Sequence, residues 1–171
     1  MMSVENVNRA SLLSYSATFI ALIAAGSWVS IPFFPVPLTL QTFFVLLAGV
    51  VMRKHAAIPV LLYVALGALN LPLFHNGTAG VGVLLGPTGG FLIGFIPAAA
   101  LAGLSYESES RSVRIGGLIL ATLAIYACGV SWLSFSASIP LLESFLLGAV
   151  PFIPGDAVKL FAAYRIGKRL E

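Results

Sequence analysis

Residues 10–52 read "ASLLSYSATFIALIAAGSWVSIPFFPVPLTLQTFFVLLAGVVM" and contain no Asp, Glu, Lys or Arg. A helix that spans a bilayer needs roughly 20 mostly apolar residues, so this run is long enough for two. The prolines of "PFFPVP" at residues 32–37 mark the break between them, because proline interrupts helices. The stretch therefore predicts two consecutive membrane helices rather than part of a water-soluble domain.

The same pattern continues along the chain, because residues 56–106 and 115–142 also lack charged side chains. Only 9% of the 171 residues are charged and 59% are hydrophobic, whereas a soluble domain carries about 25% charged residues. We therefore expect an all-α membrane protein of the cell membrane, a multi-pass bundle that forms one integral domain over residues 1–171 and has the lipid bilayer as its surroundings. Six transmembrane helices are expected near residues 13–31, 38–52, 56–73, 83–104, 113–133 and 141–166.

The basic residues predict the orientation of these helices. Eight of the nine fall on one side of the six-span arrangement: Arg9, Arg53, Lys54, Arg111, Arg114, Arg165, Lys168 and Arg169. The loops on the other side, near residues 32–37, 74–82 and 134–140, have none. Because Lys and Arg mark the cytoplasmic side of a membrane protein, we expect both termini to be cytoplasmic.

The ninth basic residue, Lys159, lies inside the last apolar segment, three residues after Asp156. An ionisable side chain within a span costs at least ~2.5 kcal/mol and is by default a functional-site hypothesis. Residues at i and i+3 share a helix face, so the two charges can partly neutralise each other. The alternative is a buried ion pair that only fixes the register of the helix.

Further polar residues lie near the outer side of the expected bundle. Thr39, Gln41 and Thr42 open the second span, Asn70 ends the third and Thr88 begins the fourth. Taken singly, Asn70 fits a helix C-cap and Gln41 fits an interhelical contact. Together with the charge pair they favour a site for a small polar solute with donors and acceptors. They do not favour a metal site, because neither histidine has a carboxylate cluster nearby.

Four ordered motifs carry a family resemblance: "PVPLTLQTFFVLLAG" (35–49), "LGALNLPLF" (66–74), "GPTGGFLIGF" (86–95) and "PFIPGDAVK" (151–159). In these the chain resembles the BioY family, the biotin-binding S components of energy-coupling factor (ECF) transporters. The resemblance implies a six-helix bundle of the ECF S-component type with an outward-facing vitamin pocket. It also implies that the biotin rings lie deep in the pocket and that the valeryl chain points toward the outer loops.

The residue chemistry agrees with biotin as the ligand and suggests a set of contacts. Asp156, Lys159 and Asn70 would bind the ureido group, which has two N–H donors and one carbonyl acceptor. Gln41 and Thr42 would be their neighbours. The aromatic wall of the pocket would come from Phe74, Phe91 and Tyr164, and Thr88 with the amides near Gly89 and Gly90 would meet the biotin carboxylate.

A strip of small residues on the first span suggests a partner. Ala17, Ala21 and Ala25 recur every four residues, and small faces let helices approach closely in lipid. Packing inside the bundle is one interpretation. The resemblance implies another, in which the strip docks on the transmembrane coupling protein of an ECF module whose ATPase subunits supply the energy.

Several functions are disfavoured by the sequence. The glycine-rich run "GTAGVGVLLGPTGG" (77–90) lacks the G-K-[ST] of a phosphate-binding loop, so we expect no nucleotide hydrolysis in this chain, no cofactor and no enzymatic activity. No extended basic surface with aromatic residues favours nucleic acid. Two alternatives to biotin uptake remain: an S component for another small vitamin, and a small channel or proton-coupled carrier in which Asp156 and Lys159 form a gate.

Overall fold

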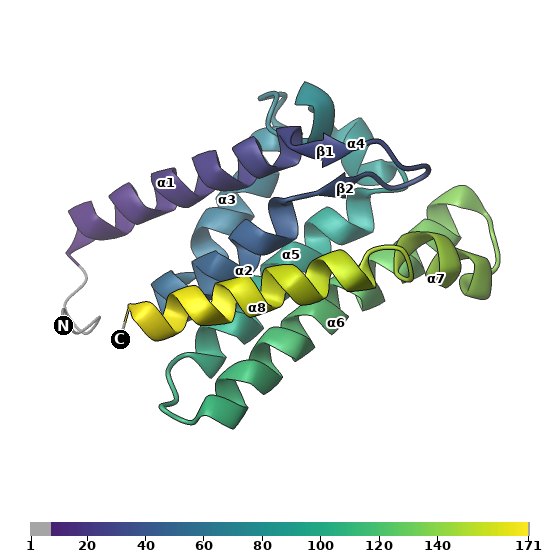
Figure 1. The fold of residues 1–171 in the computed structure, drawn as a ribbon. Coiled ribbons are helices and arrows are strands. Elements are labelled where there is room, and N and C mark those ends of the chain that lie inside the picture. Colours follow the sequence, from purple (N-terminus) through teal and green to yellow (C-terminus); the bar gives the residue numbers. More distant parts are fainter. Residues whose placement is uncertain (1–7, 171) are drawn as a thin grey trace.

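The computed structural model of the protein describes residues 8–170, so residues 1–7 and 171 of the expected domain lie outside the described part. The described chain is a helical bundle with one short β-hairpin (Figure 1). Its longer helices are α1 (Arg9–Trp28), α2 (Gln41–Met52), α3 (Ala57–Ala68), α5 (Gly89–Ser105), α6 (Arg111–Ala137) and α8 (Ile153–Arg169). Shorter elements connect them: β1 (Ser30–Ile31), β2 (Leu38–Thr39), α4 (Val81–Leu85), α7 (Leu141–Gly148) and the 3-10 turns η2 (Arg53–His55) and η3 (His75–Gly77).

Small residues hold the central helices close together. α5 packs along α6 and also against α2. A side chain at Gly129 of α6 would collide with the ring of Phe91, and one at Gly49 of α2 would collide with Ala102. Because no methyl group fits at these crossings, the helices can pack almost backbone to backbone, as is common for helices in lipid.

Each of the six expected apolar segments contains a helix, but the boundaries differ where the backbone is interrupted. The second segment, expected from residue 38, begins as strand β2, which pairs antiparallel with β1, and becomes helical only at Gln41. The fourth, expected from residue 83, is split into α4 and α5 around Pro87. Proline has no N–H to donate and restricts the residue before it to extended conformations, so both expected helix starts were wrong.

The sixth segment, expected as one helix over residues 141–166, is broken. α7 and α8 meet at an angle of 55° across a break of four residues or fewer. Pro151 lies in this break, and Pro154 lies in the first turn of α8, where its missing N–H costs no helical hydrogen bond. The break places the first turn of α8 inside the bundle, and this turn carries Asp156.

Helix length alone identifies fewer spans than the sequence predicts. Within residues 8–170, α1 and α6 are long and apolar enough to cross a bilayer singly, and the bent pair α7–α8 makes a third candidate. α3 and α5 are apolar but shorter. Helix length and composition in the described part of the chain therefore support three spans at most, and the six-span arrangement needs other support.

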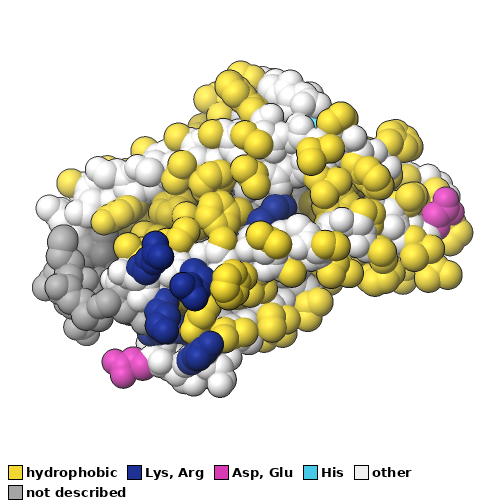
Figure 2. Space-filling model, in the orientation of Figure 1, with side chains coloured by type: hydrophobic (Ala, Val, Ile, Leu, Met, Phe, Trp, Pro, Cys, Tyr) yellow, Lys and Arg dark blue, Asp and Glu magenta, His cyan; other side chains and the backbone are white. Residues whose placement is uncertain are grey.

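The surface of the molecule is largely apolar. Leu13, Leu142 and Val158 are 70%, 71% and 68% exposed, which suits contact with lipid rather than water. Figure 2 shows hydrophobic side chains over much of the visible face, with most visible Lys and Arg side chains gathered at the end where the chain's C-terminus lies. This separation of charge from apolar surface is the pattern of an integral membrane protein.

The close helix contacts yield a stability prediction. We expect Gly103→Ala to lower the free energy of unfolding by about 1–3 kcal/mol, because the new methyl group would collide with the backbone carbonyl of Arg53. Gly116→Ala on α6 is the matched control, since nothing lies within 4 Å of the added atom. Thermal unfolding in detergent measures both, and equal midpoints for the two variants would contradict the prediction.

Candidate solute-binding site

The candidate site is built around a buried ion pair in α8. Asp156 is only 3% exposed, and the Nζ of Lys159 lies 2.8 Å from its Oδ1. The backbone amide of Asp156 donates to the carbonyl of Phe152 at 2.8 Å, as expected in the first helical turn. A carboxylate there is favoured by the partial positive charge of the helix N-terminus.

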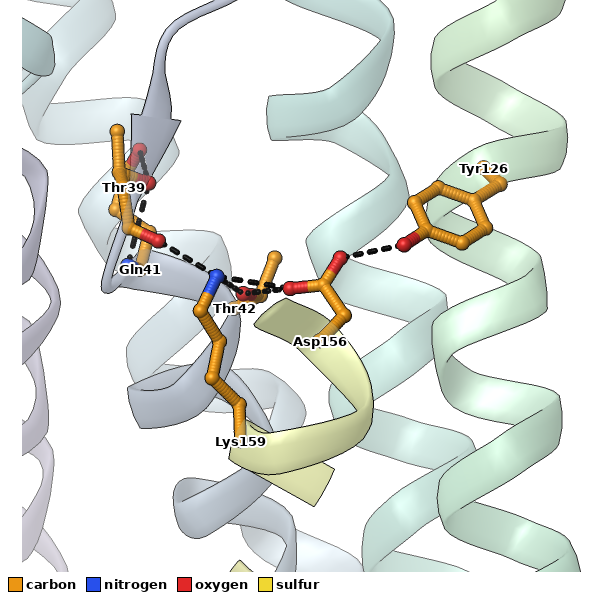
Figure 3. A network of polar contacts seen from close by, with 6 residues as sticks. All are labelled: Thr39, Gln41, Thr42, Tyr126, Asp156 and Lys159. Atoms are coloured by element: carbon orange, nitrogen blue, oxygen red, sulfur yellow. Dashed lines mark hydrogen bonds and ion pairs between the residues drawn. The ribbon is translucent and has the colours of Figure 1, made fainter. Parts of the chain in front are cut away.

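Groups from three other elements complete the bonding of the pair (Figure 3). The hydroxyl of Thr42 in α2 donates to Oδ1 of Asp156 at 2.9 Å, and the phenol of Tyr126 in α6 donates to Oδ2 at 2.6 Å. The ammonium of Lys159 also donates to the carbonyl of Thr39 at 2.8 Å and to Oγ1 of Thr42 at 2.9 Å. Together with the bond to Asp156, these contacts use all three ammonium hydrogens.

A cavity lies beside the ion pair. The space that it encloses is about 520 Å³, a figure that includes its open mouth and the solvent there. Its remaining polar side chains are those of Thr39, Gln41, Thr42, His75, Thr88 and Tyr126. Phe91, Phe95 and Phe152 form much of its apolar wall. The charge pair therefore borders an open cavity, which makes it a candidate for solute binding.

A second hydrogen-bond chain runs from the cavity wall to the loop after α3. The amide of Gln41 donates to the phenol oxygen of Tyr63 at 2.7 Å, and that phenol donates to the carbonyl of Leu73 at 2.9 Å. Gln41 also accepts a bond from the hydroxyl of Thr39 at 3.2 Å. Gln41 thus makes an interhelical contact and also lines the cavity. The sequence suggested both an interhelical contact and a place in the solute site, and the two are compatible.

The structure brings together five of the seven solute-binding residues expected from the sequence. Those five line the cavity: Gln41, Thr42, Thr88, Asp156 and Lys159. Asn70 does not line it; it follows α3 with a φ of 69°, is exposed, and places Oδ1 against Gly80. Its backbone position after a helix and its tolerance of positive φ match the C-cap interpretation.

Tyr164 also lies away from the cavity. It follows Lys159 by five residues in α8, which is about 7.5 Å along the helix axis. Its ring lies under the guanidinium of Arg111, 5.7 Å from the ring centroid, among the basic residues at the end of the bundle. Of the other expected aromatic residues, Phe91 lines the cavity, whereas Phe74 is fully buried against Gly67.

The sequence analysis did not name every cavity residue as a solute contact; those it missed include Tyr126, Phe152 and His75. Tyr126 had a usable signal, because a phenol inside an apolar span needs a hydrogen-bond partner, and Asp156 is a suitable acceptor. Phe152 lies within the motif "PFIPGDAVK" but resembles any core aromatic. His75 was considered only as a metal ligand.

Comparison with known proteins gives a consistent result. The profile described as "BioY family" matches residues 2–171. The "Biotin transporter BioY" of Thermotoga maritima is 43% identical over 155 residues, covering 90% of this chain and 91% of that protein. The protein of the same name from Rhodobacter capsulatus is 41% identical over 158 residues, covering 83% of each chain.

A solved structure is similar over nearly the whole chain. It is described as "Crystal structure at 2.1 A of the S-component for biotin from an ECF-type ABC transporter". The TM-score is 0.86 at 31% sequence identity, with 99% of this chain and 94% of that one covered. The resemblance therefore extends from sequence motifs to the arrangement of the helices.

The bonding of the ion pair yields a second stability prediction. Thr42→Val removes the hydroxyl that bridges Lys159 and Asp156, leaving a buried donor unsatisfied, and should cost about 1–3 kcal/mol of unfolding free energy. Thr122→Val is the control, because its hydroxyl bonds only the carbonyl of Leu118 in its own helix. Unfolding in detergent compares the two, and a Thr42 variant no less stable than the control would refute the bridging role.

Proposed function

Since the chain belongs to the BioY family, we propose that it binds biotin and takes it up across the cell membrane as the S component, the substrate-capture subunit, of an ECF-type transporter. It is a transporter subunit and not an enzyme. The observation that carries the proposal is the charge pair of Asp156 and Lys159 at the side of an open cavity that is lined by aromatic and polar side chains.

The ureido group of biotin fits the bonding capacity that remains at the pair. Oδ2 of Asp156 accepts one bond from Tyr126 and has a second lone pair for a ureido N–H. Lys159 has no spare hydrogen, so a bond to the ureido carbonyl would replace one of its present bonds, to Thr39 or Thr42. Bonds to charged groups in a dry pocket are the strong kind, and such a site rejects analogues that lack the ureido group.

The proposed biotin contacts are Gln41, Thr42, Thr88, Asp156 and Lys159, with Tyr126 orienting the carboxylate. Phe91, Phe95 and Phe152 offer an apolar wall for the sulfur-containing ring. Asn70 and Tyr164 are left out of this set, because neither lines the cavity.

We also propose six membrane spans with both termini in the cytoplasm. In support, each expected apolar segment contains a helix, and α7 with α8 forms a single bent candidate span. The start of α1 and the end of α8 lie at the same end of the bundle (Figure 1), where the basic side chains gather. The cavity is lined by β2 and η3, which follow α1 and α3 at their opposite ends, so it would open to the outside.

The partners proposed are the transmembrane coupling protein and the ATPase subunits of an ECF module. Ala17, Ala21 and Ala25 are all exposed, while Phe19 and Ile23 between them are buried. The small-residue strip therefore faces outward rather than into this bundle, which favours docking over internal packing. A flat strip of this kind permits close approach of a second membrane protein.

The central prediction concerns the binding of biotin itself. Purified protein should bind biotin without ATP or partner, and Asp156→Asn or Lys159→Ala should weaken binding at least tenfold, or about 1.4 kcal/mol. The physical reason is that each change removes a charged hydrogen-bonding group from the cavity. Isothermal titration calorimetry measures the affinity directly.

Exposed charges provide the matched controls. Glu143→Gln and Lys54→Ala make the same kinds of change at exposed positions away from the cavity and should leave the affinity unchanged. Size-exclusion chromatography shows whether each variant is folded. If the folded, unaltered protein gives no binding heat with biotin, the proposed function is wrong.

Docking can be tested separately from binding. Ala21→Trp should leave biotin affinity unchanged but reduce co-purification with the coupling protein at least about tenfold, because a bulky ring prevents close helix approach. Ala127→Trp, at an exposed alanine of α6, is the control. Equal recovery of the complex from both variants would exclude the alanine strip as the docking face.

A further inference from the structure

The bonding of Lys159 leaves no cation free for an anionic group of the solute. The charged and titratable side chains on the cavity are Asp156, Lys159, Tyr126 and His75, within the part of the chain that the structure describes. The ammonium of Lys159 is committed to three acceptors. The carboxylate of biotin lies at the far end of its side chain from the ureido ring, so it must meet other groups than the pair when the ring binds there.

The sequence predicts that Thr88 and the amides near Gly89 and Gly90 meet the biotin carboxylate, but these groups offer it little bonding capacity. Thr88 lines the cavity and has a neutral hydroxyl. The amide of Gly89 already donates to the carbonyl of Gly86 at 3.1 Å. Neither group brings a positive charge to an anion, and no arginine among residues 8–170 lines the cavity.

His75 is held at the cavity by a well-anchored backbone. The carbonyl of Leu73, two residues before His75, accepts bonds from the hydroxyl of Ser27 and from the phenol of Tyr63, each at 2.9 Å. Phe74 is fully buried, and its ring fills the space over Gly67. These contacts fix both residues just before His75, so its position does not depend on a free loop.

The chain after His75 is fixed as well. The amide of Gly77 donates to the carbonyl of Phe74 at 3.0 Å, and the hydroxyl of Thr78 donates to the carbonyl of His75 at 2.8 Å. The imidazole itself is partly buried and has no hydrogen-bond partner among residues 8–170. The ring is thus positioned on the cavity with its bonding capacity unused.

Building on the proposed function, we propose that His75 binds the carboxylate of biotin and takes up a proton as it does so. The imidazolium supplies an N–H donor and a positive charge with no other partner among the described residues, whereas the ammonium of Lys159 already has three acceptors. Charge-assisted bonds of this kind are about twice as strong as neutral ones.

The direction of the resulting pH dependence follows from the surroundings of the ring. Burial lowers the pKa of His75 from its ordinary value of 6.5, so the ring of the unbound protein is mainly neutral at neutral pH. A bound carboxylate favours the charged form and raises this pKa in the complex. Binding therefore takes up a proton, and the affinity rises as the pH falls from above the pKa of the complex toward that of the free protein.

Few other groups near His75 can make the affinity for biotin depend on pH in this way. The end of α1 that packs against η3 contains no titratable side chain, and Ser30 of β1 donates to Asn76 of η3. Tyr63 lies behind Phe74, with a ring-to-ring distance of 5.6 Å, and is hydrogen-bonded. Asp156, Lys159 and Tyr126 belong to the ureido end and act on carboxyl-blocked biotin as well as on biotin.

Calorimetric titration from about pH 8 to about pH 5.5 tests the proposal, a range in which a carboxylic acid of pKa near 4.3 stays ionised. The unaltered protein should bind biotin up to about tenfold more tightly at the acidic end, since a pKa rise of one unit corresponds to a tenfold change. His75→Gln, of similar size, should remove this slope. Biotinamide, whose carboxyl group is blocked, should show no slope with the unaltered protein.

His55→Gln is the matched control, because it removes the other histidine, in η2 between α2 and α3, and should leave the slope intact. A slope that persists in His75→Gln, or one equally large for biotinamide, would overturn the assignment of His75 while leaving biotin binding in place. If the unaltered protein binds biotin at no pH, the proposed function is wrong and this inference with it.

Discussion

The architecture depends on the cost of keeping Asp156 and Lys159 ionised inside an apolar bundle. Removing two charges from water costs several kcal/mol for each ion, and their mutual attraction offsets this only when further hydrogen bonds satisfy the remaining sites. Here those bonds come from Thr39, Thr42 and Tyr126. The pair thus connects α8 to α2, to α6 and to the end of the β-hairpin. The residues whose hydrogen bonds stabilise the buried charges also line one side of the cavity.

The interruptions of the helices supply the polar atoms that this arrangement needs. The carbonyl of Thr39 can accept from Lys159 because it belongs to strand β2 and not to a continuous helix. Asp156 reaches the bundle interior because α8 restarts after Pro151. Non-helical backbone at membrane depth is tolerated where it lines a cavity or is buried in protein. The residues proposed to bind the solute therefore lie at breaks in the helices for a physical reason.

Parts of the site were accessible from the sequence and parts were not. Asp156 and Lys159 stand out in any inspection, because a charge in an apolar span is expensive and rare. Tyr126 does not stand out, because its role is to donate a hydrogen bond to the carboxylate of Asp156, and that residue lies 30 positions away in the sequence. Asn70 and Tyr164 show the converse: each has suitable chemistry for the solute, but neither lines the cavity. Asn70 follows the end of α3, and Tyr164 lies under Arg111. Residue type predicts what a side chain can bind, not which space it faces.

The sequence by itself determined the class of protein, the approximate positions of the apolar helices and the presence of a costly charge pair, because these follow from composition, spacing and transfer energies along the chain. Only the tertiary structure decided that Thr42 meets Asp156 across 114 residues, that the alanine strip faces outward, and that His75 lies on the cavity. Such contacts depend on which helix faces pack together and where prolines bend the chain. That choice is made by many weak packing interactions at once, and no local pattern in the sequence records it.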